Sequence, residues 1–241
     1  MNFFVGTSGY SYKEWKGSFY PEKFSDKKML GYYAERFSTV EINYTFRQIP
    51  SETTIESWAG QVPEDFQFVC KAPQAITHHR KLQGAEEQTA QFIEALSGLK
   101  KRQGPVLFQL PPNFKKDLQR LESFLKSIKR KRAAFEFRHQ SWFEEDVFNC
   151  LRAHKCGLCI SDGDEYPVSD LIRTTDWGYV RLRREDYSDQ ELKTWIKKFK
   201  TQDWNDMYVF FRHEDVGTGP RLAARLLKLL GIKTKPFDEE G

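Results

Sequence analysis

The sequence predicts an α/β protein that folds as a single (β/α)8 TIM barrel, and two observations lead to this prediction. Eight short apolar segments recur along the 241 residues. Their starts are roughly 20 to 40 residues apart, which leaves room for a strand, a loop and a helix. Amphipathic segments lie between them. A doubly wound open sheet is the alternative architecture. Because no linker, repeat or low-complexity segment divides the chain, we expect one domain over residues 1–241.

The predicted strands are the apolar segments themselves. In chain order they are Phe3–Val5, Thr39–Ile42, Phe66–Cys70, Val106–Leu110, Ala133–Phe137, Leu158–Ile160, Tyr179–Leu182 and Met207–Phe211.

Helices are expected where apolar residues recur at helical spacing or where a start signal stands before them. The spacing predicts helices over Asp26–Phe37, Ala85–Leu99 and Asp117–Ile128. Two capping boxes predict helix starts, Ser141 with Glu144 and Ser188 with Glu191. The last helix has Pro220 near its start. We expect the polar tail Lys233–Gly241 to fray.

Composition excludes several classes of protein. No apolar run approaches the 18 residues of a membrane span, and the first residues lack the pattern of a secretory signal. Four cysteines do not suggest a disulfide scaffold, and Cys156 and Cys159 read as buried thiols. We therefore expect a cytoplasmic protein without a membrane partner. A net charge of +4 is too small to argue for nucleic acid, since the basic clusters follow predicted helices and complement their dipoles.

The barrel model also predicts which side chains point inward. The face of each strand with large apolar residues should meet the helices, so the opposite face lines the interior. By this test the first, sixth and eighth strands are ambiguous. The polar residues predicted to point inward are Glu41, Asn43, Lys71, Gln109, Glu136, Arg138, Arg181 and Arg183.

These inward charges lie at strand C-terminal ends, where this fold keeps its chemistry. Four are cationic and two are anionic, so the surplus favours an anionic ligand such as phosphate, carboxylate or sulfate. The eighth strand adds Arg212, and Gly217 and Gly219 before the last helix could present backbone N–H groups to an anion. A structural lattice of internal ion pairs is the alternative.

Aromatic and histidine side chains follow the same strand ends. Tyr10, Tyr12 and Trp15 follow the first strand and could stack on a ring-shaped ligand or cover the core. His78 and His213 follow the third and eighth strands. The sequence predicts no cofactor, and because no metal-binding histidine spacing occurs, it gives a divalent metal only weak support.

Motifs spread over nearly the whole chain resemble the YecE-like family of TIM-barrel proteins, the group called domain of unknown function 72. They are Gly6–Tyr12 with Trp15, Phe19–Pro21, Val40–Asn43 with Thr45 and Phe46, Lys71 with Ile76–His78, Phe108–Pro112, Phe135–His139 with Ser141 and Trp142, and Tyr179–Leu182. The resemblance implies a TIM barrel and no settled activity. Two places depart from the commonest form of the family: Arg183 stands where a His is frequent, and 212–214 read Arg-His-Glu where Asn-Asn-Asp is frequent.

The leading functional hypothesis is an enzyme that acts on a small anionic, phosphorylated or carboxylated, sugar-like substrate by acid–base chemistry. Glu41 or Glu136 would be the base and His78 or His213 the acid, with Lys71 as a Schiff-base former in a variant of the scheme. The substrate-binding candidates are Tyr10, Tyr12, Trp15, Asn43, Gln109, Arg138, Trp142, Arg181, Arg183 and Arg212. A non-catalytic protein that binds an anion or metabolite is the first alternative, and a metal-dependent phosphodiesterase acting on nucleic acid is the second.

Overall fold

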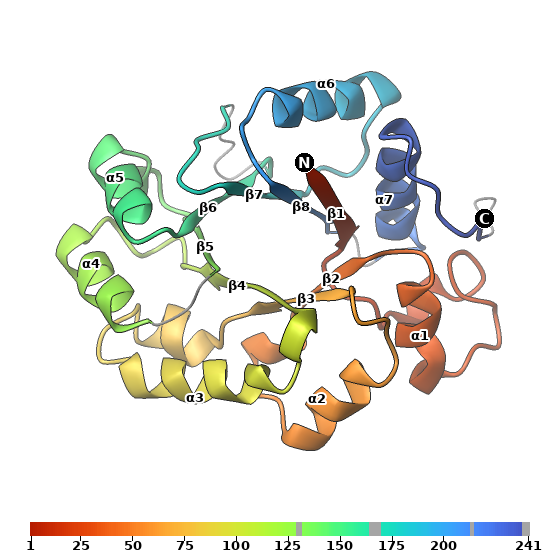
Figure 1. Ribbon diagram of the computed structural model, residues 1–241, viewed down its shortest axis with the longest axis horizontal. Helices are drawn as coiled ribbons and strands as arrows, with labels where there is room; N and C mark the ends of the chain where they lie inside the picture. Colours follow the sequence, from red (N-terminus) through yellow and green to blue (C-terminus); the bar gives the residue numbers. More distant parts are fainter. Residues whose placement is uncertain (129–131, 164–169, 213–214, 238–241) are drawn as a thin grey trace.

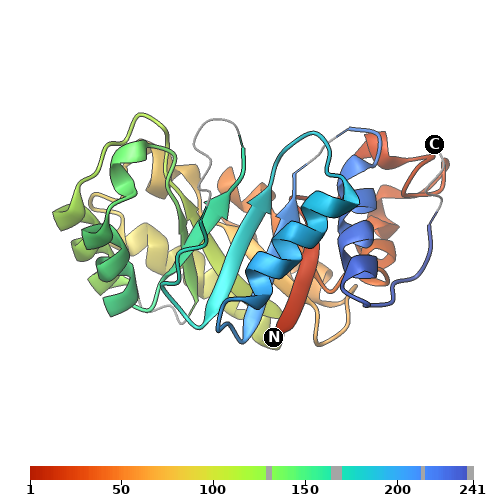
Figure 2. The same ribbon diagram turned by 90° about the horizontal axis from the view of Figure 1, so that it is seen from above.

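Eight parallel strands form a nearly closed barrel with helices around it, as the sequence predicts (Figure 1). The computed structural model describes residues 1–128, 132–163, 170–212 and 215–237. All eight strands lie on the predicted segments, and Figure 2 shows them inclined side by side within the helical layer. Their bounds are β1 Asn2–Thr7, β2 Thr39–Ile42, β3 Gln67–Lys71, β4 Gln103–Gln109, β5 Ala133–Glu136, β6 Gly157–Ser161, β7 Trp177–Leu182 and β8 Asp206–Phe211.

Seven α-helices occur in the described residues. They are α1 Met29–Ala34, α2 Glu52–Ala59, α3 Glu86–Ser97, α4 Leu118–Ser127, α5 Glu145–Ala153, α6 Asp189–Lys200 and α7 Thr218–Leu229. The connection from β6 to β7 contains no helix in its described part. In that connection the Thr174 hydroxyl accepts a hydrogen bond from the backbone N–H of Leu158 at 2.9 Å, which ties Thr174 to the start of β6.

Local sequence signals predict one helix start correctly and another wrongly. The capping box of Ser188 and Glu191 is present at the start of α6, as predicted. The box predicted from Ser141 and Glu144 is wrong. Ser141 lies in a 3₁₀ turn, and its hydroxyl accepts from the backbone N–H of Lys116 at 2.7 Å, so it is not available to cap α5. Helix α5 begins at Glu145 instead.

Two helices differ from the expected pattern in extent. The predicted helix over Asp26–Phe37 is shorter, because Asp26–Lys28 forms a separate 3₁₀ turn before α1. Helix α2 was not predicted by spacing, and the Ser51 side chain caps its start by accepting from the backbone N–H of Thr54.

Backbone pairing around the barrel is reduced at one seam, between β1 and β2. The hydrogen-bonded order runs β1-β8-β7-β6-β5-β4-β3-β2, and an isolated bridge between Ser8 and Glu41 joins the ends of β1 and β2. Below this bridge the Tyr33 hydroxyl of α1 lies between the strands. It accepts from the backbone N–H of Thr7 at 2.8 Å and donates to the carbonyl of Thr39 at 3.0 Å. A side-chain hydroxyl therefore links the strands where ladder bonds would otherwise run.

The strands carry two separate hydrophobic layers, which confirms the predicted inside and outside faces. The outer layer lies between barrel and helices and includes Val40, Phe68, Phe108, Phe135 and Val180. The inner layer fills the barrel, and it settles the ambiguous strands by turning Phe4, Cys159 and Tyr208 inward. Its members are Val69, Leu107, Ala134, Cys159, Trp177, Tyr179, Tyr208 and Phe210, with Phe4 packed against them.

Two smaller expectations can be compared with the structure. Cys156 and Cys159 are buried free thiols, as predicted. The tail does not fray as far as it is described, because Phe237 packs edge-on against Phe19 and the carbonyl of Pro236 accepts from Arg36. Residues 238–241 lie outside the described residues.

Candidate anion-binding site

A buried ion cluster crosses the barrel below the C-terminal ends of its strands. Arg181 of β7 bonds Glu41 of β2 at 2.8 Å and Glu136 of β5 at 2.7 Å. These side chains are 2%, 0% and 2% exposed, so the three charges have left water together. Such burial is tolerated only when the partners and further hydrogen bonds replace the lost hydration.

Neighbouring polar groups supply those hydrogen bonds. Glu41 accepts from the Ser8 hydroxyl at 2.7 Å and from the Tyr179 hydroxyl at 2.6 Å. Glu136 accepts from the Gln109 side-chain amide at 2.8 Å. The Nε of Arg181 is buried without a hydrogen-bond partner in the part of the chain that is described. The carboxylates are thus held in place, while the guanidinium keeps one unused donor.

The surrounding cations set the protonation state of Glu136. Burial raises the pKa of this carboxyl, but Arg181 and Arg183 outweigh burial and hold the pKa at about 2. For Arg181 burial lowers the pKa, and Glu136 and Glu41 outweigh it and raise the pKa above its ordinary value. Glu136 is therefore ionised at neutral pH and is a weak proton acceptor.

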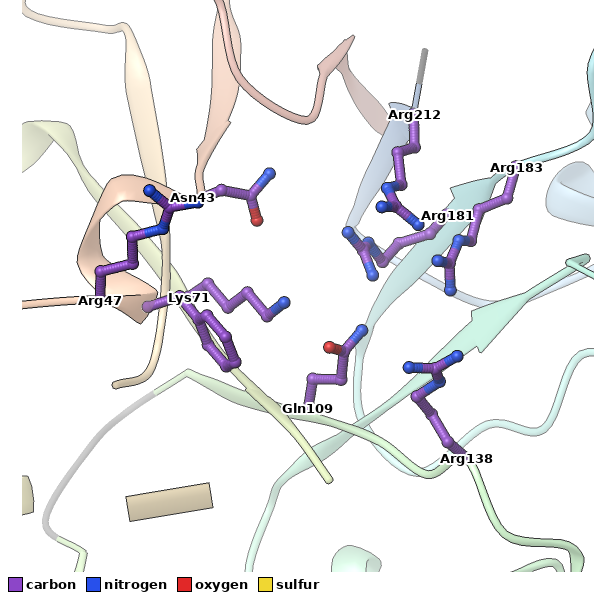
Figure 3. Close-up of a pocket in the computed structure, with 9 residues that line it drawn as sticks. Asn43, Arg47, Lys71, Gln109, Arg138, Arg181, Arg183 and Arg212 are labelled. Atoms are coloured by element: carbon purple, nitrogen blue, oxygen red, sulfur yellow. The ribbon is translucent and has the colours of Figure 1, made fainter. Parts of the chain in front are cut away.

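A pocket of about 270 Å³ adjoins the cluster, because Arg181 and Gln109 line it (Figure 3). Arg47 and Asn43 lie on one side of it, and Arg181, Arg183 and Arg212 lie on the opposite side. The lining residues are Asn43, Phe46, Arg47, Lys71, Gln109, Arg138, Arg181, Arg183 and Arg212. Six of them are cationic, and none of these described lining residues is acidic.

The cations crowd one another at this pocket. Burial, followed by the nearby Arg181, lowers the pKa of Arg183. Burial and then Arg181 also lower the pKa of Lys71 to about 8. The Lys71 ammonium lies 4.1 Å from the centre of the Phe46 ring, a cation–π contact. The pocket thus concentrates positive charge beyond what the two buried carboxylates offset.

His78 lies beside the pocket and is not among the described residues that line it. Its ring meets the Phe46 ring edge-on at 4.9 Å, and its Nδ1 is 2.9 Å from the Thr77 hydroxyl. Burial and then Lys71 and Arg138 lower the pKa of His78 to about 4, so the imidazole is neutral at pH 7. An uncharged imidazole is a poor proton donor at that pH.

A second, larger cavity of about 640 Å³ shares Asn43 and Arg47 with the pocket. Three segments form its walls: the loop after β1, the turn after β2 and helix α2. Its lining residues are Gly9, Tyr10, Ser11, Tyr12, Ile42, Asn43, Tyr44, Arg47, Thr54 and Trp58.

The structure places nine of the residues predicted from the sequence in the walls of these two cavities. Glu41 and Glu136 lie in the ion cluster, and His78 lies beside the pocket. The other three predicted residues are Trp15, Trp142 and His213. Trp15 is completely buried against Phe19 and Tyr20. Trp142 is buried against Phe137, and its indole N–H donates to the carbonyl of Phe114 at 2.7 Å. His213, predicted as an acid, lies outside the described residues.

Sequence reasoning missed several residues that line the cavities. Phe46 and Arg47 belong to or follow a 3₁₀ turn, Tyr44–Phe46, that begins directly after the inward-pointing Asn43. Their position just after a strand end could have indicated them. Trp58 and Thr54 lie on α2, which spacing did not predict, so no comparable signal pointed to them.

Two further properties of the described residues bear on function. They contain no group of three or more histidine, cysteine, aspartate or glutamate side chains placed to hold a metal ion. None of their helices has the length and apolar character that crossing a membrane requires.

The fold and the site together define a TIM-barrel-like α/β protein with a cationic pocket at the end of the barrel where this fold places its functional residues. The chain belongs to the family described as protein of unknown function DUF72, whose model matches residues 4–240. This confirms the YecE-like resemblance seen in the sequence.

Known proteins of this family resemble the chain over different lengths. The UPF0759 protein YunF of Bacillus subtilis is 26% identical over 273 residues, which cover 95% of this chain and 95% of YunF. The UPF0759 protein YecE of Escherichia coli is 32% identical over 123 residues, which are 48% of this chain and 45% of YecE.

Solved structures of the same family share the fold. A DUF72 family protein from Thermotoga maritima superimposes with a TM-score of 0.85 at 30% identity, covering 96% of this chain and 100% of that one. A DUF72 family protein from Enterococcus faecalis superimposes with a TM-score of 0.82 at 19% identity, covering 98% of each chain, and this likeness shows the fold alone.

Proposed function

We propose that the protein is an enzyme that binds a small anionic substrate in the pocket above Arg181 and acts on it by proton transfer. The observation that carries this proposal is the surplus of cations that line one small pocket. Phosphate and carboxylate groups are the natural ligands of clustered guanidinium groups, because the planar fork of Arg bonds two oxygens at once.

An internal ion-pair lattice explains only part of the cluster. Arg181 has two carboxylate partners, and Arg183 lies 3.4 Å from Glu136. Among the described residues, by contrast, no ion pair involves Arg47, Lys71 or Arg212. Of these three, Lys71 is largely buried. Burying its charge without an ion-pair partner is costly, and a bound anion would reduce that cost.

The proton-transfer role fits Lys71 better than the glutamates. A group is most effective in proton transfer when its pKa is near the working pH. Lys71, with a pKa of about 8, meets this condition, whereas Glu136 is held at about 2. Lys71 also lines the pocket. In this proposal Glu41 and Glu136 orient Arg181, and Lys71 donates or accepts the proton at the substrate.

Calorimetric titration with inorganic phosphate tests the binding half of the proposal. We expect Arg183→Met to weaken phosphate binding by about tenfold or more, since a hydrogen bond to a charged group contributes about 1.5–3 kcal/mol. Arg184→Met is the matched control, because Arg184 follows directly in the chain but pairs with Glu191 outside the pocket. Equal phosphate affinity in wild type and Arg183→Met would contradict the proposal.

A screen of phosphorylated and carboxylated small molecules tests the catalytic half. For a substrate that the wild type converts, we expect Lys71→Arg to keep affinity within a few-fold and to lose turnover, because Arg keeps the charge but does not release its proton. Turnover by Lys71→Arg at the wild-type rate would remove Lys71 from the chemistry. Phosphate binding without turnover of any compound would favour the non-catalytic alternative.

A further inference from the structure

We propose that the substrate of this site carries a planar ring next to its anionic group, and that the ring occupies the aromatic cavity lined by Tyr10, Tyr12, Tyr44 and Trp58. This inference rests on the proposed function, which places the anionic group in the arginine-lined pocket. The inference adds that the anionic group belongs to a molecule with a planar ring.

The two cavities adjoin each other. Asn43 and Arg47 line both of them, and these two residues flank the single 3₁₀ turn after β2. Figure 3 shows both side chains at one edge of the pocket, across from Arg183 and Arg212. A ligand that holds its anionic group against those arginines therefore has the aromatic cavity next to it, on the side of Asn43 and Arg47.

The chemistry of the cavity wall suits a planar ring. Tyr44 is 45% exposed, and its ring meets the Trp58 ring edge-on at 6.0 Å and 85°. Aromatic side chains bind planar rings by stacking or edge contacts, and stacking of this kind is tolerant of which ring is bound. Ser11, Thr54 and Asn43 line the same cavity and offer hydrogen bonds to polar groups at a ring edge.

Hydrogen bonds and close packing hold the cavity wall in place before any ligand binds. The Tyr12 hydroxyl donates to the carbonyl of Ser8 at 2.8 Å, and the Tyr20 hydroxyl donates to the carbonyl of Tyr10 at 2.5 Å. Gly9 has a φ of +90°, and a Cβ there would lie 2.4 Å from the Tyr12 hydroxyl oxygen. Glycine thus permits Tyr12 to approach the backbone closely. Preorganised walls reduce the entropy lost on binding.

The volume agrees with a small-molecule ligand of this kind. The cavity of about 640 Å³ lies within the range of roughly 300–1,000 Å³ found for small-molecule sites. The arginine pocket of about 270 Å³ suits a single anionic group. The pair of cavities therefore suits one anion joined to one ring system better than two separate small ions.

Titration with two phosphate esters tests this inference. Methyl phosphate supplies the anion alone, and phenyl phosphate adds a planar ring. We expect wild type to bind phenyl phosphate at least tenfold more tightly than methyl phosphate. Tyr44→Ala should reduce this advantage to about threefold or less and leave methyl phosphate binding unchanged, because Tyr44 does not line the arginine pocket. Ile49→Ala, another exposed apolar residue that does not line the cavity, should keep the full advantage.

The outcomes separate the two proposals. If methyl phosphate binds and phenyl phosphate gains nothing, the ring inference is overturned and the anion site stands. If the advantage of phenyl phosphate survives in Tyr44→Ala at its wild-type size, the ring lies elsewhere and the inference is overturned as well. If neither ester binds, both the anion site and the ring inference are overturned.

Discussion

The positive charge of Lys71 lowers the stability of the folded protein. Burial and the nearby Arg181 lower its pKa to about 8, against about 10.4 in an unfolded chain. Below pH 8 Lys71 is protonated in both states, so the full cost of keeping the charge opposes folding. Between pH 8 and about 10.4 the folded state loses its proton first, and this cost falls as the pH rises.

We therefore predict that Lys71→Met stabilises the protein at pH 7. The expected gain in the free energy of unfolding is about 1–2 kcal/mol, discounted from 1.36 kcal/mol per pKa unit because the side chain keeps some contact with water. The gain should shrink as the pH rises from 8 to about 10.4. Urea unfolding at a series of pH values measures it, and a destabilised Lys71→Met at pH 7 would contradict this picture.

The contribution of Glu136 to stability has the opposite dependence on pH. Its pKa is about 2 in the folded state and near 4.3 when unfolded, so it contributes stability above pH 4.3 that is lost as the pH falls toward 2. We predict that Glu136→Gln lowers the free energy of unfolding at pH 7 by about 3–5 kcal/mol, since Arg181 loses a buried partner.

Denaturant unfolding between pH 2.5 and 7 tests this prediction. The difference between wild type and Glu136→Gln should narrow as the pH falls through about 4. Glu145→Gln is the control, because Glu145 makes a surface ion pair with Arg152, and it should leave stability unchanged. If Glu136→Gln and the wild type had the same free energy of unfolding at pH 7, the buried ion cluster would contribute nothing to stability.

For single residues, the sequence predicts where the charged side chains lie better than it predicts their chemical roles. Glu41, Glu136 and Arg181 point inward because strand alternation leaves no other choice once the apolar face is known. Which cation pairs with which carboxylate depends on strands that are far apart in the chain, and no local pattern carries that information. The pairing decides that Glu136 is a weak base, so its role could not be predicted from the sequence.

At the level of a single element, the start of helix α6 offers a simple test of a local sequence signal. The Ser188 side chain accepts from the backbone N–H of Glu191, and the Glu191 side chain accepts from the backbone N–H of Ser188 in return. We predict that Ser188→Ala lowers the free energy of unfolding by about 1 kcal/mol. Thr194→Ala, in the middle of the same helix, should cause no loss, since alanine has the higher helix propensity. Thermal unfolding compares them, and an equal melting temperature for Ser188→Ala and Thr194→Ala would contradict the role of the cap.

The contrast with Ser141 shows the limit of such signals. Both serines stand three residues before a glutamate. The Ser188 hydroxyl is near only its own helix start, whereas the Ser141 hydroxyl bonds the backbone of Lys116, on the loop after β4. A contact between distant segments therefore overrides the local pattern, and sequence spacing alone cannot foresee it.

At the scale of the whole molecule, barrel closure depends on Tyr33. Its hydroxyl satisfies the backbone N–H of Thr7 and the carbonyl of Thr39 at the seam between β1 and β2. We predict that Tyr33→Phe lowers the free energy of unfolding by about 1–3 kcal/mol, because both buried groups lose their partner. Hydrogen exchange at the Thr7 amide should also become faster.

Tyr32→Phe is the matched control for this seam. Tyr32 precedes Tyr33 on α1, and no hydrogen bond from its hydroxyl occurs in the described part of the chain. It should leave both stability and Thr7 exchange unchanged. Slow Thr7 exchange in Tyr33→Phe would mean that other contacts hold the seam closed.

The architecture could be predicted from the sequence because it follows from a repeated pattern. Eight apolar segments with amphipathic segments between them favour a parallel sheet covered by helices, and the structure has that arrangement. The seam between β1 and β2 departs from the repeat. There the Tyr33 hydroxyl links the two strands, and no periodicity singles out that side chain.

The central claim is that the cationic pocket at the end of the barrel binds an anion. A crystal structure of the protein with tungstate, a tetrahedral oxyanion that scatters anomalously, tests it most directly. We predict an anomalous peak in the pocket of Figure 3, within hydrogen-bond distance of Arg183 and Arg212, that disappears in Arg183→Met crystals and persists in Arg184→Met crystals. A wild-type map with no peak in this pocket at millimolar tungstate would contradict the account.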